Sequence, residues 1–284
     1  MKRRRFLRIV AGMALCGGAV QAQTWQGRAF GADLQITAAG ALPLARIREE
    51  IAQIEAVFSL FRPSELQELN QRGRVAGSAR LRTVLHAARQ VHAQTQGAFD
   101  PSIQPLWRAL AEGGDPVAAR ALIGFDRLRM GAHVRLGPAQ ALTLNGIVQG
   151  YAADRVAELC AQAGLGRCLV DMGEFRALGG PFHIGLEDPQ AGRLGQRSLS
   201  RGAIATSSPA ALWLAGGSHI LGPAGQKPHW STVSVEGPSA MICDAASTAF
   251  VLMDRHAISR AAKGLGLRAV SLVDMDGNLE TFRV

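Results

Sequence analysis

Helical and strand-like periodicities alternate irregularly along this chain, and this mixture constrains the fold more than any other feature of the sequence. Helix-like segments, in which apolar residues recur every three or four positions or glycine closes the run, lie at 44–58, 81–91, 151–163, 244–253 and 258–265. Strand-like segments lie between them, at 142–144, 168–170, 182–186, 232–236, 269–273 and 279–284. Because helices and strands do not alternate regularly, as they would in a doubly wound sheet, the sequence predicts an α+β fold.

The chain is expected to form one domain over residues 23–284. No repeat of roughly 20–50 residues recurs, which disfavours a solenoid or propeller. Glycine-rich stretches at 110–118, 188–196 and 214–228 are expected to be loops, and Asp276-Gly277 predicts a hairpin turn. No linker longer than such a loop divides these residues, so we predict a single mixed α/β domain.

Residues 1–22 have the layout of a bacterial export signal. A basic cluster from Lys2 to Arg8 without any acid precedes an apolar run from Ile9 to Val20, and Val20-Gln21-Ala22 offers a cleavage site. The run is shorter than the ~20 residues needed to span a bilayer. Arg3-Arg4-Arg5-Phe6-Leu7-Arg8 resembles a twin-arginine signal, and an ordinary secretory signal is the alternative. We therefore expect the mature chain in the periplasm.

The net charge of +9 first suggests a nucleic-acid or membrane partner. Five of these charges lie in the predicted export signal, and the rest of the chain carries an ordinary excess of +4. We therefore expect no nucleic-acid partner. Three cysteines remain outside the signal, Cys160, Cys168 and Cys243. Cys160 and Cys168 can pair in an oxidising compartment or serve as small buried apolar residues, and both interpretations stay open.

A series of short motifs covers most of the chain from about residue 58 to residue 254. They are Phe61-Arg62-Pro63-Ser64-Glu65-Leu66 with Leu69-Asn70, Gly97-Ala98-Phe99-Asp100-Pro101-Ser102, Leu144-Asn145-Gly146-Ile147-Val148-Gln149-Gly150-Tyr151-Ala152-Ala153-Asp154, Leu169-Val170-Asp171-Met172-Gly173-Glu174, Ala205-Thr206-Ser207, His219-Ile220-Leu221, and Pro238-Ser239-Ala240-Met241 with Asp244-Ala245-Ala246-Ser247-Thr248-Ala249. In this order they resemble the ApbE family, the FAD:protein FMN transferases of the bacterial envelope. Each motif alone is weakly specific, whereas the ordered set is specific.

The resemblance implies a reaction, two partners and a cofactor. FMN would pass from FAD through its phosphate to a Thr or Ser hydroxyl of an exported redox protein, with release of AMP and dependence on Mg²⁺. Such phosphoryl chemistry requires charge neutralisation and positioning above all. The implied partners are FAD and the acceptor protein, and association with a membrane is expected only through that acceptor.

The residues themselves offer a metal site. Asp244 and Thr248 are four positions apart and share one helix face, and their oxygens suit Mg²⁺. The alternative is that Asp244 caps a helix and Thr248 bonds back to it. The resemblance implies the main-chain carbonyl of Gly146 as a third ligand, and Ser247 as another where some relatives have an acid.

His219 is the candidate catalytic base, because histidine titrates near neutral pH. The resemblance implies that it activates the acceptor hydroxyl, and the alternative is a residue that contacts flavin or orders its loop. Gly146 and Gly150 flank a helix start, whose N–H groups suit phosphate. The absence of G-x-G-x-x-G disfavours a Rossmann site. Residues implied to contact FAD are Phe61, Ala98, Phe99, Asp100, Thr143, Gln149 and Ile220.

Several positions depart from the family pattern. Relatives often carry an acid at Thr143, a lysine at Gln149 and an aspartate at Gly222, and the turn before Glu174 has one glycine fewer. These departures keep two alternatives open. The first is an FAD pyrophosphatase that yields FMN and AMP with water as the acceptor. The second is a diverged flavin-binding protein without turnover.

Overall fold

A single large antiparallel sheet organises the fold, which confirms the α+β prediction. The computed structural model describes residues 22–215 and 217–284, so residues 1–21 of the predicted export signal lie outside it. The strands, in their order across the sheet, are β1 (Ala22–Ala29), β2 (Ala32–Ala39), β6 (Cys168–Asp171), β7 (Phe175–Leu178), β10 (Gly202–Ser207), β13 (Thr232–Gly237), β14 (Ala269–Val273) and β15 (Leu279–Arg283). All neighbouring pairs are antiparallel, so the strand order follows the chain without a parallel crossover.

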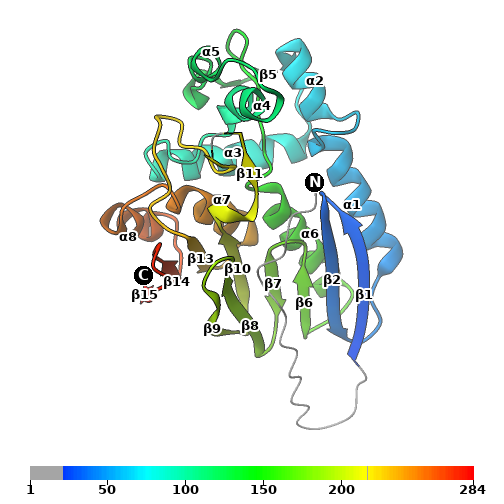
Figure 1. Cartoon of the computed structure of the whole chain (residues 1–284). Helices are drawn as coiled ribbons and strands as arrows, with labels where there is room; N and C mark the ends of the chain where they lie inside the picture. The colour runs from blue at the N-terminus through cyan, green and yellow to red at the C-terminus, as the bar shows by residue number, and fades with distance from the viewer. Residues whose placement is uncertain (1–21, 216) are drawn as a thin grey trace.

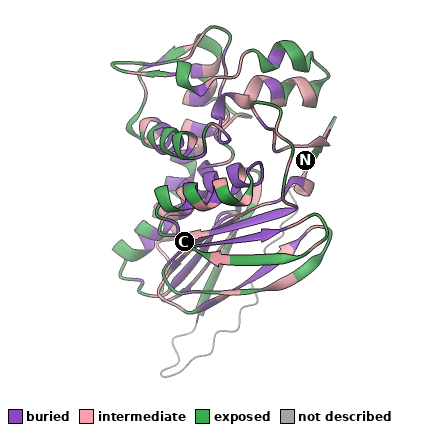
Figure 2. Ribbon diagram, turned by 90° about the vertical axis from the view of Figure 1, so that its left-hand side faces the viewer, coloured by how far each residue is buried: buried purple, intermediate pink, exposed green. Residues whose placement is uncertain are grey.

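Helices cover one face of this sheet. They are α1 (Leu44–Phe58), α6 (Val148–Gln162), α7 (Ala240–Phe250) and α8 (Arg255–Gly264), and Figure 1 shows them layered against the strands. Their apolar sides and the facing strand residues form the main core, which appears as the buried interior in Figure 2. The helices α6 and α7 lie at its centre, where both pack against the sheet and against each other.

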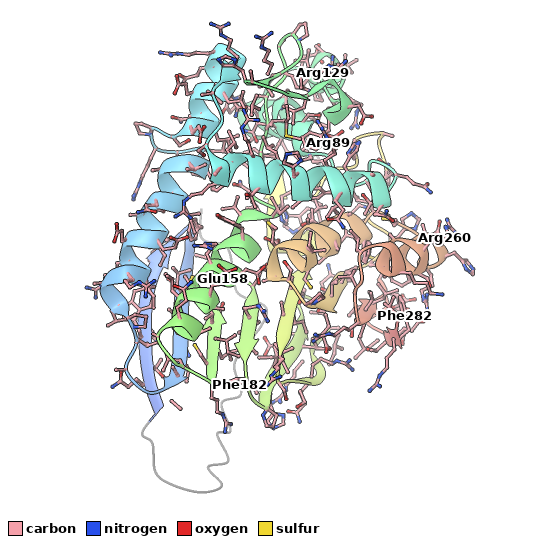
Figure 3. All side chains as sticks on the ribbon, turned by 180° about the vertical axis from the view of Figure 1, so that it is seen from behind. Arg89, Arg129, Glu158, Phe182, Arg260 and Phe282 are labelled. Atoms are coloured by element: carbon pink, nitrogen blue, oxygen red, sulfur yellow. The ribbon has the colours of Figure 1, made fainter. Side chains whose placement is uncertain are left out.

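A hairpin of two strands, β8 (Phe182–Asp188) and β9 (Gly192–Leu199), covers part of the opposite face. A second, smaller core lies between this hairpin and the sheet. Successive side chains of β6 point to opposite faces of the sheet, so Val170 joins the main core while Leu169 joins the second core. The second core also holds Phe182, which Figure 3 shows at the end of the sheet far from α3. The sheet is therefore buried on both faces in its central strands.

The remaining elements gather at one end of the molecule (Figure 1). They are α2 (Glu65–Arg72), β3 (Arg74–Val75), α3 (Ala79–Gln94), α4 (Gln104–Glu112), α5 (Pro116–Arg120), β4 (Arg129–Met130), β5 (Val134–Arg135), β11 (Trp213–Leu214), β12 (Gly217–Ser218) and the short 3₁₀ turns Pro101–Ile103, Phe125–Arg127 and Pro209–Ala211. The helix α3 separates this end from the helices that cover the sheet.

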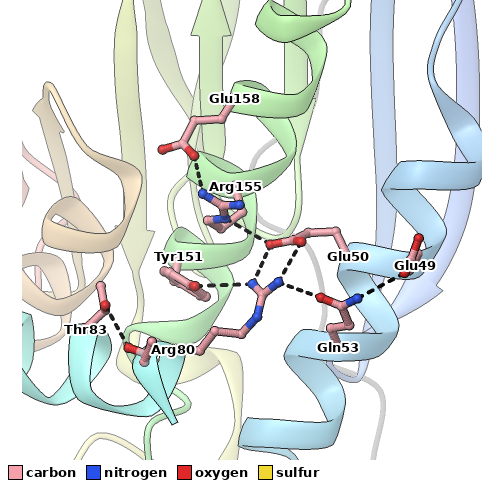
Figure 4. A network of polar contacts seen from close by, with 9 residues as sticks. Glu49, Glu50, Gln53, Arg80, Thr83, Tyr151, Arg155 and Glu158 are labelled. Atoms are coloured by element: carbon pink, nitrogen blue, oxygen red, sulfur yellow. Dashed lines mark hydrogen bonds and ion pairs between the residues drawn. The ribbon is translucent and has the colours of Figure 1, made fainter.

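A partly buried ion cluster joins α1, α3 and α6 (Figure 4). The carboxylate of Glu50, which is 7% exposed, accepts from Arg80 Nη1 and Nη2 at 2.5 and 2.8 Å and from Arg155 Nε at 2.9 Å. Arg80 also donates to the Tyr151 hydroxyl at 3.4 Å, in the first turns of α6. The hydrogen bonds from Arg80 and Arg155 hold the pKa of Glu50 below its usual range despite burial.

Most predicted elements are confirmed, and several predictions need correction, among them the loop 214–228, which contains the short strand β12. The predicted strand 142–144 has no regular structure, because Leu142 pairs its N–H and C=O with the Asn70 side chain at 2.8 and 2.9 Å instead of with a strand. The predicted loop 188–196 contains the start of β9, and the predicted loop 110–118 contains parts of α4 and α5. The helix predicted from Asp244 begins at Ala240.

Within residues 22–215 and 217–284, no helix is both long and apolar enough to cross a membrane. The cysteines Cys160, Cys168 and Cys243 are buried free thiols in this structure.

Candidate functional site

The predicted site lies where α6 crosses α7, and Gly150 permits that crossing. A Cβ atom at Gly150 would lie 2.8 Å from the Met241 Cα atom and even closer to the Ala240 carbonyl. The Gly150 N–H donates to Asp244 Oδ2 at 3.0 Å. The helix α6 begins at Val148, so Gly150 lies inside its first turn and its N–H binds the carboxylate of Asp244.

Asp154, a residue of α6, binds the first residues of α7 and holds them in place. Its carboxylate accepts from Ser239 Oγ at 2.7 Å and from the N–H groups of Ala240 and Met241 at 3.0 and 3.1 Å, and it pairs with Arg176 Nε at 3.0 Å. These contacts satisfy N–H groups that the first turn of a helix leaves unpaired. Asp154 thus sets the position of the helix that carries Asp244 and Thr248.

Asp244 does not cap its helix, so the structure excludes that alternative. Ser239 is the N-cap residue and accepts from Ile242 N–H, which places Asp244 in the second turn. The carboxylate of Asp244 is 3% exposed and lies at the α6–α7 crossing. Burying a carboxylate costs free energy unless it is paired or hydrogen-bonded, so the Asp244 carboxylate requires polar or cationic contacts at this position.

The residues predicted to bind the metal beside Asp244 approach one another closely. A Cβ atom at Gly146 would lie 3.0 Å from Thr248 Oγ1, which shows how closely the two residues approach. Thr248 Oγ1 lies 3.3 Å from Ser207 Oγ at the end of β10. Ser207 Oγ lies 2.8 Å from Ser247 Oγ, which donates to the Asp244 carbonyl at 3.0 Å. Three hydroxyl groups therefore lie in contact beside Gly146, two of them on the helix that also carries Asp244.

This oxygen set is the donor chemistry that a hard cation prefers. Among the residues that the structure describes, no group of three or more His, Cys, Asp or Glu side chains could hold a metal ion. The predicted set of Gly146, Asp244, Ser247 and Thr248 is a different kind of site. It contains one carboxylate, and its other ligands would be hydroxyl and main-chain oxygens. Its residues are compatible with Mg²⁺, which commonly keeps water and phosphate among its ligands.

His219 follows the β11–β12 hairpin and is oriented by it. Its backbone N–H and its ring Nδ1 both contact the Leu212 carbonyl at 3.1 Å. Because a carbonyl only accepts, Nδ1 carries the proton in the neutral ring, and Nε2 carries the lone pair. The hairpin thus holds the tautomer that a general base requires. The adjacent Ile220 is buried, and its N–H donates to Ser218 Oγ at 2.9 Å.

The motif from Ala98 to Asp100 is held by α3. Phe99 donates its N–H to Thr95 Oγ1 at 3.1 Å, and its carbonyl contacts His92 Nδ1 at 2.8 Å. The Phe99 ring approaches the metal residues, since a Cβ atom at Gly146 would lie 3.6 Å from Phe99 Cε2. Ala98 and Phe99 are buried. The structure therefore brings this predicted FAD motif beside the predicted metal site.

A cavity of about 530 Å³ adjoins the same motif. Its wall includes Gly97 and Asp100 on one side and the segment 223–226, which follows His219, on the other. The Asp100 carboxylate accepts from Ser102 Oγ at 2.5 Å and from Phe125 N–H at 3.3 Å. The volume falls in the range typical of small-molecule sites. The cavity therefore lies between this motif and the loop that follows the His219 motif.

The other predicted FAD residues lie in different surroundings. Gln149 is buried, and its amide lies 2.8 Å from the position a Cβ atom would take at Gly173, a glycine with φ of +101°. Thr143 accepts from Asn145 N–H at 3.3 Å and bonds through its own N–H to the Pro101 carbonyl at 2.8 Å. Phe61 is 85% exposed in the connection between α1 and α2, where its N–H donates to Ser59 Oγ at 3.1 Å.

Gly222 is required by its loop. A Cβ atom there would lie 2.5 and 2.6 Å from Gln226 N and Oε1. Arg120 Nη1 donates to the carbonyls of Gly222 and Pro223 at 2.8 and 2.9 Å, which fastens the loop to the end of α5. An aspartate at this position would therefore force the loop into another shape.

Sequence reasoning missed Ser207 and Asp154 as site residues. Both lie inside the motifs that carried the resemblance, so the motifs themselves were the available signal. Their roles depend on partners distant in the sequence, which no local pattern identifies. Glu174 acts in the same way, since its carboxylate accepts from Thr206 N–H at 3.0 Å and fixes the end of β10 beside Ser207.

Comparisons with known proteins identify the family and the fold. The model of the ApbE family matches residues 30–271. A curated FAD:protein FMN transferase of Rhodobacter capsulatus is 27% identical over 289 aligned positions, which cover 88% of this chain. The chain spans only 55% of that relative's length.

Solved structures share the fold. A flavin transferase ApbE from Vibrio cholerae matches with a TM-score of 0.79 and 22% identity, covering 93% of this chain and 97% of the other. The apo form of the Pseudomonas stutzeri flavinyl transferase ApbE matches with 0.79 and 23%, covering 93% and 94%. The ApbE protein from Thermotoga maritima matches with 0.82 and 22%, covering 92% and 96%. Because the ApbE family model matches most of the chain, the chain belongs to the ApbE family.

Proposed function

We propose that this chain is an FAD:protein FMN transferase. The observation that carries the proposal is the convergence of Asp244, Thr248, Gly146 and Phe99 from three separate motifs at the α6–α7 crossing. The name of the Rhodobacter capsulatus relative supports the same activity. FAD is then the substrate, and a protein hydroxyl is the acceptor.

The reaction would exchange one bond to phosphorus for another. The oxygen of a Thr or Ser hydroxyl on the acceptor attacks the phosphorus of the FMN half of FAD. The bond from that phosphorus to the bridging oxygen breaks, and AMP leaves with this oxygen. His219 Nε2 receives the hydroxyl proton, because Nδ1 is already committed to the Leu212 carbonyl.

The predicted metal fits the residues present. Asp244, Thr248 and the Gly146 carbonyl would hold Mg²⁺, with Ser247 as a further ligand. When bound, the ion would neutralise charge on the pyrophosphate. Asp154 and Gly150 position the carboxylate for that task, and Ser207 orders the hydroxyls beside it.

FAD would lie along the motif from Ala98 to Asp100, with part of the dinucleotide in the adjoining cavity. The buried Phe99 and Ile220 offer apolar contact, and Gln149 offers an amide from α6. Phe61 is exposed enough to reach a flavin ring at the surface. Thr143 lies on the segment between Pro101 and Gly146 and completes the predicted set.

We also propose export of the chain to the periplasm by the twin-arginine route. Support comes from the basic cluster, the short apolar run and the cleavage pattern in residues 1–22. The acceptor would then be an exported redox protein, and only that partner would bring the chain to a membrane.

One experiment separates this function from its alternatives. The protein is incubated with FAD, MgCl₂ and a candidate acceptor, and both in-gel flavin fluorescence and AMP are measured. A fluorescent acceptor with equimolar AMP is expected. AMP without a labelled acceptor would instead indicate a pyrophosphatase, and bound FAD without AMP would indicate a flavin carrier.

Matched variants test the two main assignments. Asp244→Asn should abolish the dependence of transfer on Mg²⁺ and lower its rate by about 100-fold, because loss of even an outer-shell partner of a metal ligand costs about 10–100-fold. Asp254→Asn, which alters an exposed cap on α8, is the control. His219→Ala should lower transfer by roughly 100-fold or more while FAD binding persists. His229→Ala, in the following loop, should leave the rate unchanged.

A further inference from the structure

Three arginines lie side by side on the small sheet formed by β3, β5 and β4, in which β5 is the middle strand. Arg135 of β5 pairs in register with Arg74 of β3 on one side and with Arg129 of β4 on the other. Residues directly opposite each other in an antiparallel sheet share one face, with Cβ atoms about 4.5–5.5 Å apart. The three side chains therefore form one row across the sheet, which we call the arginine row.

The arginine row faces solvent. All three arginines are exposed, whereas Val75 and Val134, the next residues along β3 and β5, are buried in the main core. Figure 3 shows Arg129 beyond α3, on the side away from the large sheet. Within residues 22–215 and 217–284, no acid forms an ion pair with any arginine of the row.

The backbone that carries the row is held in place by α3. Arg82 donates from Nη1 to the Gly131 carbonyl at 2.9 Å and from Nη2 to the Ala132 carbonyl at 3.2 Å, in the turn between β4 and β5. Arg89 Nη2 donates to the Leu128 carbonyl at 3.0 Å, directly before β4. Like charges placed directly opposite one another destabilise a sheet. The chain thus fixes three cations in a row and supplies no acid to offset their repulsion.

We propose that the arginine row binds an acidic helix face of a partner protein, on which carboxylates recur once per turn. Side chains three or four positions apart on a helix have Cβ atoms about 5–6 Å apart, which matches the spacing of the row. Each guanidinium presents paired N–H donors that fit the two oxygens of a carboxylate.

The surroundings of the row favour a protein over a membrane surface as the partner. Proteins that lie on membranes usually insert apolar side chains beside their basic ones. Among the described residues, no large exposed apolar side chain lies on β3, β4 or β5. The row also lies outside the motifs that form the proposed active site, so it can be altered without changing that site.

Two helical peptides of identical composition test the proposal. Each contains three glutamates in a background of alanine and glutamine. In the first peptide the glutamates are four and then three residues apart and share one face, whereas in the second they are five apart and spread around the helix. The full chain is titrated into each fluorescently labelled peptide at low ionic strength, where charge contacts are least screened. The one-face peptide should bind about threefold or more tightly than its isomer.

Matched variants locate the binding on the row. Arg135→Gln removes the middle arginine and should weaken binding of the one-face peptide by about 2–5-fold. Replacing Arg74, Arg129 and Arg135 together by glutamine should weaken it by roughly tenfold or more. Arg260→Gln, which removes the same charge from an exposed position on α8 (Figure 3), should change binding little.

Urea unfolding shows whether the row serves the fold instead. Because the arginines repel one another, Arg135→Gln should raise the unfolding midpoint at low ionic strength, and the gain should shrink in salt. A lower midpoint would overturn the proposal, as would equal binding of the two peptides or a triple variant that binds the one-face peptide like the native chain. Vesicles of phosphatidylglycerol that bind the native chain more tightly than either peptide, but not the triple variant, would assign the row to a membrane and also overturn it.

Discussion

Replacing Asp154 by asparagine tests whether one side chain of α6 positions α7. In the native chain, Oδ1 accepts from Ala240 N–H and pairs with Arg176 Nε, while Oδ2 accepts from Ser239 Oγ and Met241 N–H. An asparagine keeps one oxygen and turns an amino group toward hydrogen-bond donors. Two of these bonds are therefore lost, and Arg176 loses its counter-charge.

The expected loss of stability follows from these contacts. Hydrogen bonds to a charged group contribute about 1.5–3 kcal/mol each, so losing two costs about 3 kcal/mol at the lower end of that range. The lower end applies because the Asp154 side chain remains 18% exposed. For a domain of this size, such a loss lowers the melting temperature by about 6–12 °C.

Thermal and urea unfolding followed by circular dichroism measure the effect. Asp115→Asn is a matched control, because Asp115 also caps a helix, accepting from Val117 and Ala118 N–H, but does so in an exposed position. The control should cost about 1 kcal/mol or less. If Asp154→Asn destabilises no more than this control, the cap on α7 does not have the importance assigned to it.

The same variant also separates positioning from stability. Transfer of FMN is measured at a temperature where both variants are folded. We expect Asp154→Asn to lower the rate by about tenfold or more, since small misplacements of reacting groups are costly. A destabilised variant that still transfers at the native rate would show that Asp154 supports the fold without positioning Asp244.

Three further perturbations have defined outcomes. Glu50→Gln leaves two arginines without their shared carboxylate and should cost about 3 kcal/mol in urea unfolding at neutral pH, against about 0.5 kcal/mol or less for the exposed Glu68→Gln. Because folding lowers the pKa of Glu50, its contribution is present above the ordinary value of about 4.3 and disappears as pH falls through the folded value, so wild type and variant should converge in acid. Gly150→Ala should lower thermal stability by about 1–3 kcal/mol through contact with the α7 backbone, whereas Gly166→Ala, which has open space, should be neutral. Asn70→Ala should cost about 2 kcal/mol or more in urea unfolding, because it leaves two backbone groups before α6 without their partner.

Local periodicity predicts those elements whose stability depends on one buried face. The helix α1 has the predicted bounds, since Ile47, Ile51, Ile54 and Phe58 form a single apolar stripe that packs into the core. The central strands are predicted for a similar reason, as short apolar runs in the interior of a sheet. The sequence therefore predicts the α+β class and most helices directly.

Elements fixed by distant side chains are not predicted. Residues 142–144 look like a strand, yet the amide of Asn70, 72 positions away, replaces the strand neighbour. The first turn of α7 carries no local signal beyond Ser239, because Asp154, more than 80 positions earlier, satisfies its N–H groups. In both cases a tertiary hydrogen bond overrides the local pattern.

The site shows the same division. The spacing of Asp244 and Thr248 on one helix face is local, so the sequence indicates it before any fold is known. The approach of Ser207 to Thr248 spans 41 positions and depends on β10 ending beside α7. Gly146 was expected beside Thr248 only from the family resemblance. In the structure the two residues are close because Gly150 lets α6 and α7 cross with little separation.

The order of strands in the large sheet bears on how the chain assembles while it is being synthesised. Each strand pairs with the strand of the same sheet that precedes it along the chain, from β1 at one edge to β15 at the other. No strand has to insert between two that have already paired, so the sheet can grow at one edge as the ribosome delivers new segments. The strand of this sheet that is delivered after the others, β15, extends an outer edge, and a nascent chain synthesised as far as residue 278 already contains every interior strand of the sheet.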